Sequence, residues 1–246
     1  MSGHSKWSTI KRKKGALDAK RSKIFSRIVK EIHVAVKEGG PDPSANPRLR
    51  LAIQNAKGVN MPKDNIERAI NKADSDSGNY NEVSFEGYAP HGVAVFIECL
   101  TDNNQRTVSN IRAIFNKYGG SLGTNGSLSF LFERKGIFTI PKVDLNREEL
   151  ELELIDAGLE EMDEDEENYI LTTPMEEFGN MQKKLDKMNI KVINAELQRI
   201  PNDTKVLDVE SAKKVLQVIE AFEDDDDVQN VYHNLEMTDE LAKTLN

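Results

Sequence analysis

The chain has 246 residues, of which 38% are hydrophobic and 30% charged, and its formal net charge is −9 at pH 7. This composition is too apolar for a disordered chain, and no apolar run reaches the ~18 residues that a membrane-spanning helix needs. The single cysteine excludes an internal disulfide and a zinc site built from several cysteines. We therefore expect a cytoplasmic protein with no membrane partner.

Charge is divided unevenly along the chain. Residues 1–80 hold 17 Lys and Arg against 8 Asp and Glu, whereas residues 81–246 hold 16 against 34. Within residues 1–30 there are ten basic side chains and one acid. A basic end on an acidic body predicts a polyanionic partner, which the body repels and thereby helps to orient.

The first 80 residues are predicted to form a basic arm and three helices. Through residues 18–38 apolar side chains recur at every fourth position: Ile24, Ile28, Ile32 and Val36. Shorter apolar stripes predict a second helix over residues 45–58 and a third after Pro62. Because the links are short, these helices are expected to pack as a small bundle, with residues 1–80 as the first domain.

Beyond residue 80 strand and helix patterns alternate. Residues 81–134 predict strand–helix–strand, and residues 202–246 predict the same series again. Residues 135–201, between them, predict strand–helix–strand–strand–helix–strand, which is the ferredoxin-like order. We therefore expect an α+β protein: an N-terminal helical bundle followed by two ferredoxin-like α/β domains. One of these is discontinuous (81–134 plus 202–246), and the acidic one (135–201) is inserted in it.

Several details of this interpretation are specific. The first strand after the bundle is placed at residues 92–101, and further strands at Leu128–Phe132 and at residues 204–209. Thr173–Glu176 predicts a capping box with Pro at the first helical position. The acidic run Asp224–Asp227 is interpreted as a solvated turn, with a weak cation site or a contact to a basic surface as the alternative.

Motifs for catalysis are absent from the sequence. The patterns GxxxxGK[ST] and GxGxxG do not occur, and the four histidines lack metal-ligand spacing. The glycine-rich segment Tyr118–Ser127 follows a predicted helix and precedes a strand, whereas a phosphate-binding loop leads from a strand into a helix. A simple turn is the favoured interpretation, and we expect no cofactor, no metal site and no small-molecule substrate.

Binding chemistry is concentrated at the N-terminus. Lys and Arg neutralise phosphates and release counterions, and the indole of Trp7 either stacks on a base or fills the junction between arm and bundle. A second basic set lies on the second and third predicted helices. Arg106 stands beside a helix start, where it could hold a phosphate, while Asn103 or Asn104 caps that helix. The predicted nucleic-acid-binding residues are Lys6, Trp7, Lys11, Arg12, Lys13, Lys14, Lys20, Arg21, Lys23, Arg48, Arg50, Lys57, Lys63, Arg68 and Arg106.

Long motifs in a fixed order run through the whole chain. They are Gly3-His4-Ser5-Lys6-Trp7, Gly39–Pro43, Asn46–Arg50, Asn60–Ile70, Glu86-Gly87-Tyr88, Thr101-Asp102-Asn103, Arg106-Thr107, Gly119–Gly123 and Asp227–Tyr232. In these motifs the sequence resembles the YebC/PmpR family, whose mitochondrial members are translational activators of a cytochrome oxidase subunit. The resemblance implies a cytoplasmic bacterial protein with a helical domain, two α/β domains and no enzyme activity.

Two functions are implied by the resemblance: a DNA-binding transcriptional regulator, and a ribosome-associated factor that helps translation through stalling sequences such as proline runs. No helix-turn-helix with base-reading side chains is visible, and basic residues beside glycine and proline turns fit folded ribosomal RNA at least as well. A protein–protein adaptor acting through the acidic domains is a further alternative.

Overall fold

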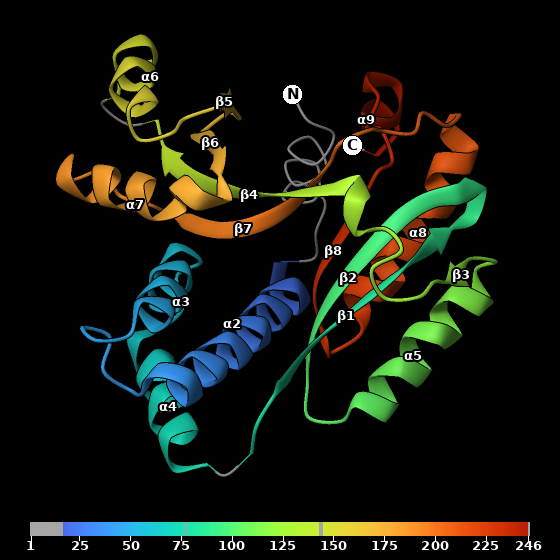
Figure 1. The fold of residues 1–246 in the computed structure, drawn as a ribbon, viewed down its shortest axis with the longest axis horizontal. Coiled ribbons are helices and arrows are strands. Elements are labelled where there is room, and N and C mark those ends of the chain that lie inside the picture. Colours follow the sequence, from blue (N-terminus) through green and yellow to red (C-terminus); the bar gives the residue numbers. More distant parts are fainter. Residues whose placement is uncertain (1–16, 77, 143–144, 246) are drawn as a thin grey trace. The chain divides into compact units, whose positions relative to one another are not determined.

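The protein is seen here in a computed structural model that divides into two compact units (Figure 1). The described residues are 17–76, 78–142 and 145–245. The first unit comprises the residues up to Lys30, Ser77–Glu133 and Ile200–Asn246. The second unit comprises Glu31–Asp76 and Arg134–Arg199. Each unit holds one four-stranded sheet with helices, so the mixed α+β class is as predicted, whereas the division into three domains stays a prediction.

The buried side chain of Asn46 connects the helices of the second unit. Its helices are the second half of α2 (Leu17–Gly39), α3 (Pro47–Gly58) and α4 (Lys63–Ser75). The side chain of Asn46 accepts from the backbone N–H of Leu49 at 3.0 Å and so caps α3. Its amide donates to the carbonyls of Ala35 and Gly40 at 2.7 and 2.9 Å. One side chain thus fixes the turn between α2 and α3, and the three predicted helices are confirmed.

The sheet of the second unit follows the predicted order of elements. They are β4 (Phe132–Pro141), α6 (Arg147–Ile155), β5 (Glu161–Glu164), β6 (Asn168–Pro174), α7 (Phe178–Lys187) and β7 (Asn194–Pro201). In the sheet the strands lie in the order β5–β6–β4–β7. Phe138 of β4 and Leu171 of β6 are register partners, and they share one core with Leu154 of α6 and Leu185 of α7.

Helix α3 is fastened to edge strand β7. The side chain of Asn55 accepts from the N–H of Ala195 and donates to its carbonyl, both at 2.9 Å. Near the end of α3, a Cβ on Gly58 would lie 1.7 Å from the carbonyl oxygen of Ile193. The side-chain amide of Asn55 makes the two hydrogen bonds to Ala195 that a neighbouring strand would make, and Gly58 lets α3 approach β7 closely. Helix α3 and the sheet therefore belong to one unit.

The first unit is built around a β-hairpin. Its elements are β1 (Asn81–Ala89), β2 (Val93–Thr101), α5 (Asn104–Lys117), β3 (Ser121–Leu122), α8 (Val209–Asp224), β8 (Val228–His233) and α9 (Asp239–Leu245). The sheet order is β3–β1–β2–β8, and all three pairings are antiparallel. Helices α5 and α8 pack on one face, where the rings of Phe115 and Phe222 lie 4.7 Å apart above Val95 and Ile97.

The predicted order of elements in this unit is wrong in three places. Strand β1 was not predicted, because polar residues at alternate positions conceal it; one of them, Glu86, is nevertheless buried. Leu128–Phe132 is not a strand, since Ser129–Leu131 forms a 3₁₀ turn and β4 begins only at Phe132. Residues 204–209 contribute a single bridge, from Lys205 to Leu235. The unit therefore does not consist of two strand–helix–strand series.

The predicted capping box at Thr173 is also wrong. The hydroxyl of Thr173 donates to the carbonyl oxygen of Gly158 at 2.7 Å instead of capping a helix. A 3₁₀ turn (Met175–Glu177) follows, and α7 begins at Phe178. The tertiary contact to Gly158 therefore overrides the local capping preference.

Candidate nucleic-acid interface

The predicted nucleic-acid-binding residues fall into three groups. Lys6, Trp7, Lys11, Arg12, Lys13 and Lys14 lie outside the described residues, and of Lys20 only the backbone, within α2, is described. In the first unit the described members are Arg21 and Lys23 of α2 and Arg106 of α5. In the second unit they are Arg48, Arg50 and Lys57 of α3 and Lys63 and Arg68 of α4.

The basic residues in the first half of α2 contact the acidic segment that joins α8 to β8. Lys23, Arg27 and Lys30 recur at helical spacing, which places them on one face of α2. Lys23 Nζ lies 3.1 Å from Asp224, and Arg27 donates to the carbonyl of Glu223 at 2.9 Å. This basic stripe of α2 is thus already engaged within the protein, by the carboxylate of Asp224 and the backbone carbonyl of Glu223.

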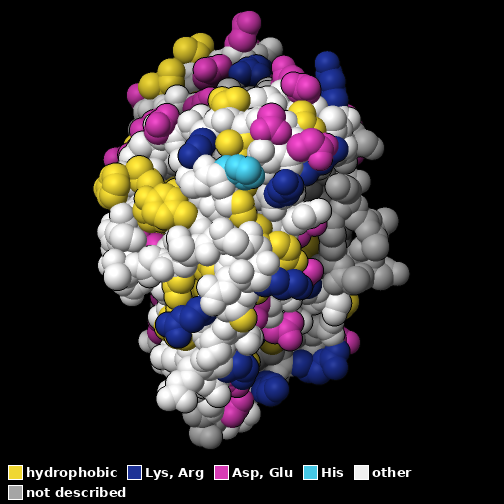
Figure 2. Space-filling view, turned by 90° about the vertical axis from the view of Figure 1, so that its right-hand side faces the viewer, with side chains coloured by type: hydrophobic (Ala, Val, Ile, Leu, Met, Phe, Trp, Pro, Cys, Tyr) yellow, Lys and Arg dark blue, Asp and Glu magenta, His cyan; other side chains and the backbone are white. Residues whose placement is uncertain are grey.

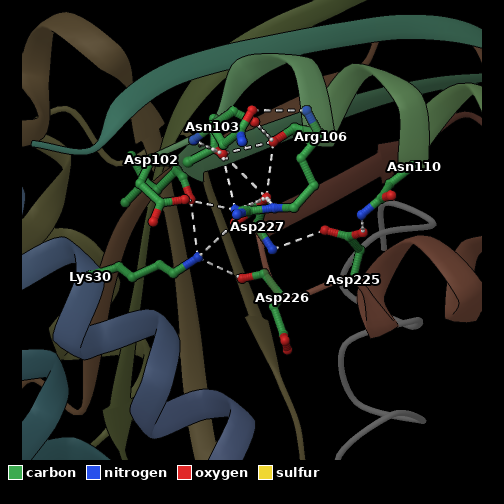
Figure 3. A network of polar contacts seen from close by, with 11 residues as sticks. Lys30, Asp102, Asn103, Arg106, Asn110, Asp225, Asp226 and Asp227 are labelled. Carbon is green, nitrogen blue, oxygen red and sulfur yellow. Dashed lines mark hydrogen bonds and ion pairs between the residues drawn. The ribbon is translucent and has the colours of Figure 1, made fainter.

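Asp227 is the centre of this contact, as Figure 3 shows. Its side chain is 4% exposed, and Arg106 approaches it to 2.7 Å through Nη2. The hydroxyl of Thr107 donates at 2.9 Å and that of Thr101 at 3.2 Å. Lys30 Nζ completes the set at 3.1 Å. One buried carboxylate therefore joins α2, the end of β2, α5 and the start of β8.

The backbone around Asp227 belongs to the same network. Lys30 Nζ also donates to the carbonyls of Leu100 and Asp226, at 3.1 and 2.8 Å. The side chain of Asn103 accepts from the N–H of Arg106 at 3.1 Å, so Asn103 caps α5. This confirms the capping interpretation of Asn103 and accounts for the position of Arg106 in the first turn of α5.

Burial and hydrogen bonding act in opposite directions on the pKa of Asp227. Burial by itself raises the pKa of a carboxyl group, but the hydrogen bonds from Arg106, Thr107 and Lys30 outweigh it and hold the pKa of Asp227 below its usual value. The same hydrogen bond from Arg106, with another to Asp102, raises the pKa of the guanidinium. Both groups are therefore charged at neutral pH.

Arg27 of this stripe is partly buried. Burial lowers the pKa of its guanidinium, while Glu223 and Asp224 oppose that shift. Its Nη2 donates to Glu223 in the last turn of α8, where carbonyl oxygens lack helical partners and the helix dipole favours a cation. Arg27 thus caps the C-terminal end of α8.

The basic residues of the second unit are divided between internal contacts and exposed positions. Arg48 binds Glu31 at 2.9 Å and Glu38 at 2.7 Å, both on α2. Arg50 donates to the carbonyls of Pro43 and Ser44 at 2.6 and 2.7 Å.

Helix α4 shows the same division. Arg68 donates to the carbonyl of Asp64 at 3.2 Å and also binds Asn65. Lys63 lies 3.4 Å from Glu67, but both side chains are well exposed, so this pair contributes little to stability. Lys57, at the end of α3, is exposed as well.

Comparisons with known proteins assign the whole chain to one family. Residues 5–76 match the family model described as the TACO1/YebC protein N-terminal domain, and residues 80–235 match the model of the TACO1/YebC second and third domain. The chain belongs to the TACO1/YebC family. This is the family that the sequence motifs resemble.

Curated relatives of this TACO1/YebC protein match over nearly their full length. A "Probable transcriptional regulatory protein" of Amoebophilus asiaticus is 54% identical over 239 residues, which cover 96% of this chain and 98% of the relative. A protein of the same name from Rubrobacter xylanophilus is 48% identical and covers 98% of each chain. The crystal structure of a conserved hypothetical protein from Aquifex aeolicus matches with a TM-score of 0.80 and 44% identity, covering 89% of this chain and 91% of that one.

Two contributions to the network of this TACO1/YebC protein were missed from the sequence. Arg27 and Lys30 were not predicted as site residues, although their spacing from Lys23 is visible in the chain. The solvated turn predicted at residues 224–227 fits Asp224, whose side chain is 84% exposed, but is wrong for the buried Asp227. Identical side chains in one run thus have different environments, which only the tertiary structure reveals.

Neither a metal-ligand group nor a membrane-spanning helix occurs in the part of this TACO1/YebC protein that the structure describes. No group of three or more His, Cys, Asp or Glu side chains there is placed to hold a metal ion. No helix among these residues is long and apolar enough to cross a membrane.

Proposed function

We propose that this protein is a non-enzymatic, cytoplasmic nucleic-acid-binding regulator of gene expression, namely a DNA-binding transcriptional regulator of the YebC/PmpR type. The observation that carries the proposal is the ratio of ten basic side chains to one acid in residues 1–30. Such a segment binds phosphates without reading sequence. The names of the curated relatives support the regulatory role.

The contacts of α2 assign two roles to its cations: some anchor the helix, and the others are available to bind phosphate. Arg27 and Lys30 are engaged with backbone carbonyls and, for Lys30, with a buried carboxylate, so we assign them to anchoring α2. Lys23 is paired with the exposed Asp224, and since exposed pairs contribute little, a phosphate can replace that partner. The phosphate contacts are then assigned to Lys23 and the preceding cations: Lys6, Lys11, Arg12, Lys13, Lys14, Lys20 and Arg21.

Ribosomal RNA is the alternative target, which would make the protein a ribosome-associated factor that relieves stalling. Arg50 donates to two carbonyls of the glycine- and proline-rich turn before α3 and so stiffens that turn. A rigid turn with Arg50 beside it suits the irregular shape of folded RNA, whereas duplex DNA is usually read by side chains projecting from a helix in the major groove. Measuring the affinity for DNA and for ribosomal RNA side by side distinguishes the two targets.

The test is a binding titration over a series of salt concentrations. A fluorescent DNA duplex and a structured ribosomal RNA fragment are titrated with the wild type and with a variant carrying Lys11, Arg12, Lys13 and Lys14 as Glu. We expect the slope of log affinity against log salt to fall by about 4 in that variant. The matched control reverses four exposed lysines elsewhere: Lys183, Lys187, Lys191 and Lys214.

The control makes the result specific because both variants change the net charge equally. Equal loss in both would mean that overall charge, and not the N-terminal segment, governs binding, and an N-terminal variant that binds like the wild type would refute the proposal. Tighter binding to the RNA fragment than to the duplex at every salt concentration would favour the ribosomal alternative.

A protein–protein adaptor is the second candidate, favoured by the surface of α6. Leu152 is 71% exposed, and Ile155, one turn further along the helix, is also exposed. Acidic side chains surround the pair: Glu148, Glu149, Glu151 and Asp156. An apolar pair with an acidic rim fits a partner surface with an apolar centre and basic rim. Loss of a nuclease-resistant complex in a Leu152→Ala variant would support this role.

A further inference from the structure

One side of helix α5 carries a stripe of exposed polar side chains. Its members follow one another at spacings of four, three and four residues, which places them on one side of the helix: Gln105, Ser109, Arg112 and Asn116. The opposite side holds Thr107, Ile111 and Phe115, which are buried. Within the described part of the chain, none of the four exposed side chains makes a hydrogen bond or ion pair. The stripe is therefore available to a partner.

The surroundings of the stripe do not repel phosphate. Of the 166 residues from 81 to 246, 34 are Asp or Glu, yet none lies in residues 103–132. Two carboxylates that contact α5 are already bound, Asp102 by Arg106 at 2.8 Å and Asp225 by Asn110 at 2.9 Å. Figure 2, which views the side of the molecule on which α5 lies, shows largely uncharged surface with several Lys and Arg side chains in its lower half. A polyanion can thus approach this helix although the rest of the half is acidic.

The side chains of the stripe are of the types that read base pairs. Arg forms paired hydrogen bonds with guanine, Asn and Gln form them with adenine, and Ser bonds to either base. Ala113, also exposed on α5, offers a methyl group of the kind that contacts the methyl group of thymine. On the neighbouring helix α8 the exposed positions include Glu210, Lys214 and Glu220. A face that is merely solvated needs no such exclusion of acids, so the composition of α5 favours contact with DNA.

The dimensions of α5 fit the major groove of duplex DNA. The stripe extends over 11 residues, or about 16 Å at the helical rise, which corresponds to about five base pairs. The major groove is wide enough for an α-helix, whereas the corresponding groove of an RNA duplex is too deep and narrow. Asn103 caps the start of the helix, and Phe115 fixes it from behind against the ring of Phe222. The reading side chains therefore project from a rigid element, as groove recognition requires.

We propose that the outer face of α5 enters the major groove of duplex DNA and reads its sequence through Gln105, Arg112 and Asn116. The basic N-terminal residues bind phosphates without reading sequence, so α5 supplies the selectivity that a transcriptional regulator needs. Lys117, exposed at the end of α5, contacts the phosphates that border the groove. The inference rests on the proposed function and assigns sequence recognition to a separate part of the molecule.

The test separates sequence recognition from phosphate binding. A preferred sequence is first selected from DNA duplexes randomised over about ten base pairs, and the selected duplex and a scrambled duplex are then titrated at one salt concentration. We expect Arg112→Ala and Asn116→Ala to weaken binding of the selected duplex about tenfold and that of the scrambled duplex about twofold at most. Arg112→Lys keeps the charge but not the paired hydrogen bonds, and loses most of the preference. The control Lys214→Ala removes an equal charge from the exposed surface of α8 and keeps the wild-type preference.

A modified duplex shows which groove is read. Replacing the guanines of the selected duplex by 7-deazaguanine removes a hydrogen-bond acceptor from the major groove alone. We expect this replacement to weaken binding by the wild type and to cause no further loss in Arg112→Ala. Equal sensitivity of the two proteins would show that Arg112 does not read guanine in the major groove.

Three further results would overturn the inference. The wild type selects no preferred sequence, or Arg112→Ala weakens the selected and scrambled duplexes equally, or it weakens a structured ribosomal RNA fragment as much as the selected duplex, in which case α5 contacts RNA. If the four N-terminal charge reversals abolish binding of both duplexes while Arg112→Ala keeps the wild-type preference, this inference fails and the proposed function stands. If the reversals change nothing while Arg112→Ala weakens the selected duplex, the role proposed for the N-terminal residues fails and that of α5 stands.

Discussion

Replacing Asp227 by Asn tests whether the buried carboxylate holds the first unit together. The substitution keeps the shape but removes the charge, and it turns one acceptor into a donor facing Arg106 and Thr107. Lys30, whose side chain is only 15% exposed, loses its carboxylate partner. Breaking a buried ion pair from one side costs about 3–5 kcal/mol. Because Asn keeps one acceptor, we expect a loss of about 3 kcal/mol in the free energy of unfolding.

The assay is thermal and urea unfolding at neutral pH, followed by circular dichroism. For a unit of this size about 3 kcal/mol corresponds to a fall in Tm of about 9 °C. The matched control is Asp226→Asn, which removes the same charge from the neighbouring exposed side chain. The control is expected to stay within about 0.5 kcal/mol of the wild type. Equal stability of the two variants would refute the reasoning.

The remaining predictions concern pH and the contact between α3 and β7. Hydrogen bonding lowers the pKa of folded Asp227, so its contribution is complete above about pH 4 and disappears as the pH falls through the folded-state pKa. The stability difference between wild type and Asp227→Asn should therefore shrink in urea titrations as the pH falls below about 4; a constant difference would contradict the assignment. Asn55→Ala leaves both backbone groups of Ala195 without their amide partner and should cost about 2 kcal/mol in urea unfolding, and an unchanged midpoint would argue against the strand-like pairing. Gly58→Ala would place a Cβ 1.7 Å from the oxygen of Ile193 and should cost about 3 kcal/mol, measured in the same way; a neutral effect would mean that α3 is free to shift.

Elements whose signals are local were predictable from the sequence. Helix α3 has a capping Asn46, Pro47 in its first turn and an apolar stripe, and it lies where the stripe placed it. Strand β2 begins with the continuous apolar run Val93–Ile97 and is buried along nearly all its length. Strand β1 was missed because burial of Glu86 depends on N–H groups about 40 residues further along the chain, which no local pattern records.

The candidate site was predictable in composition but not in its contacts. Counting charges was enough to locate the basic residues of α2, but not to show that Lys30 binds Asp227 almost 200 residues away. Arg106 was singled out correctly as a residue beside a helix start, yet its main partner, Asp227, lies in a run of four identical acids. Which of the four is buried depends on how β8 packs, so it follows from tertiary structure alone.

The central claim, that the basic N-terminal residues bind nucleic acid, is tested most directly by cross-linking in cells. Cells producing the wild type, the four-residue reversal at Lys11–Lys14 or the four-lysine control are treated with formaldehyde, and the protein is purified under denaturing conditions. We predict that nucleic acid sensitive to DNase copurifies with the wild type and the control but is lost from the N-terminal variant. RNase-sensitive material with the same dependence would select the ribosomal alternative. Equal recovery from all three proteins, or none from the wild type, would contradict the claim.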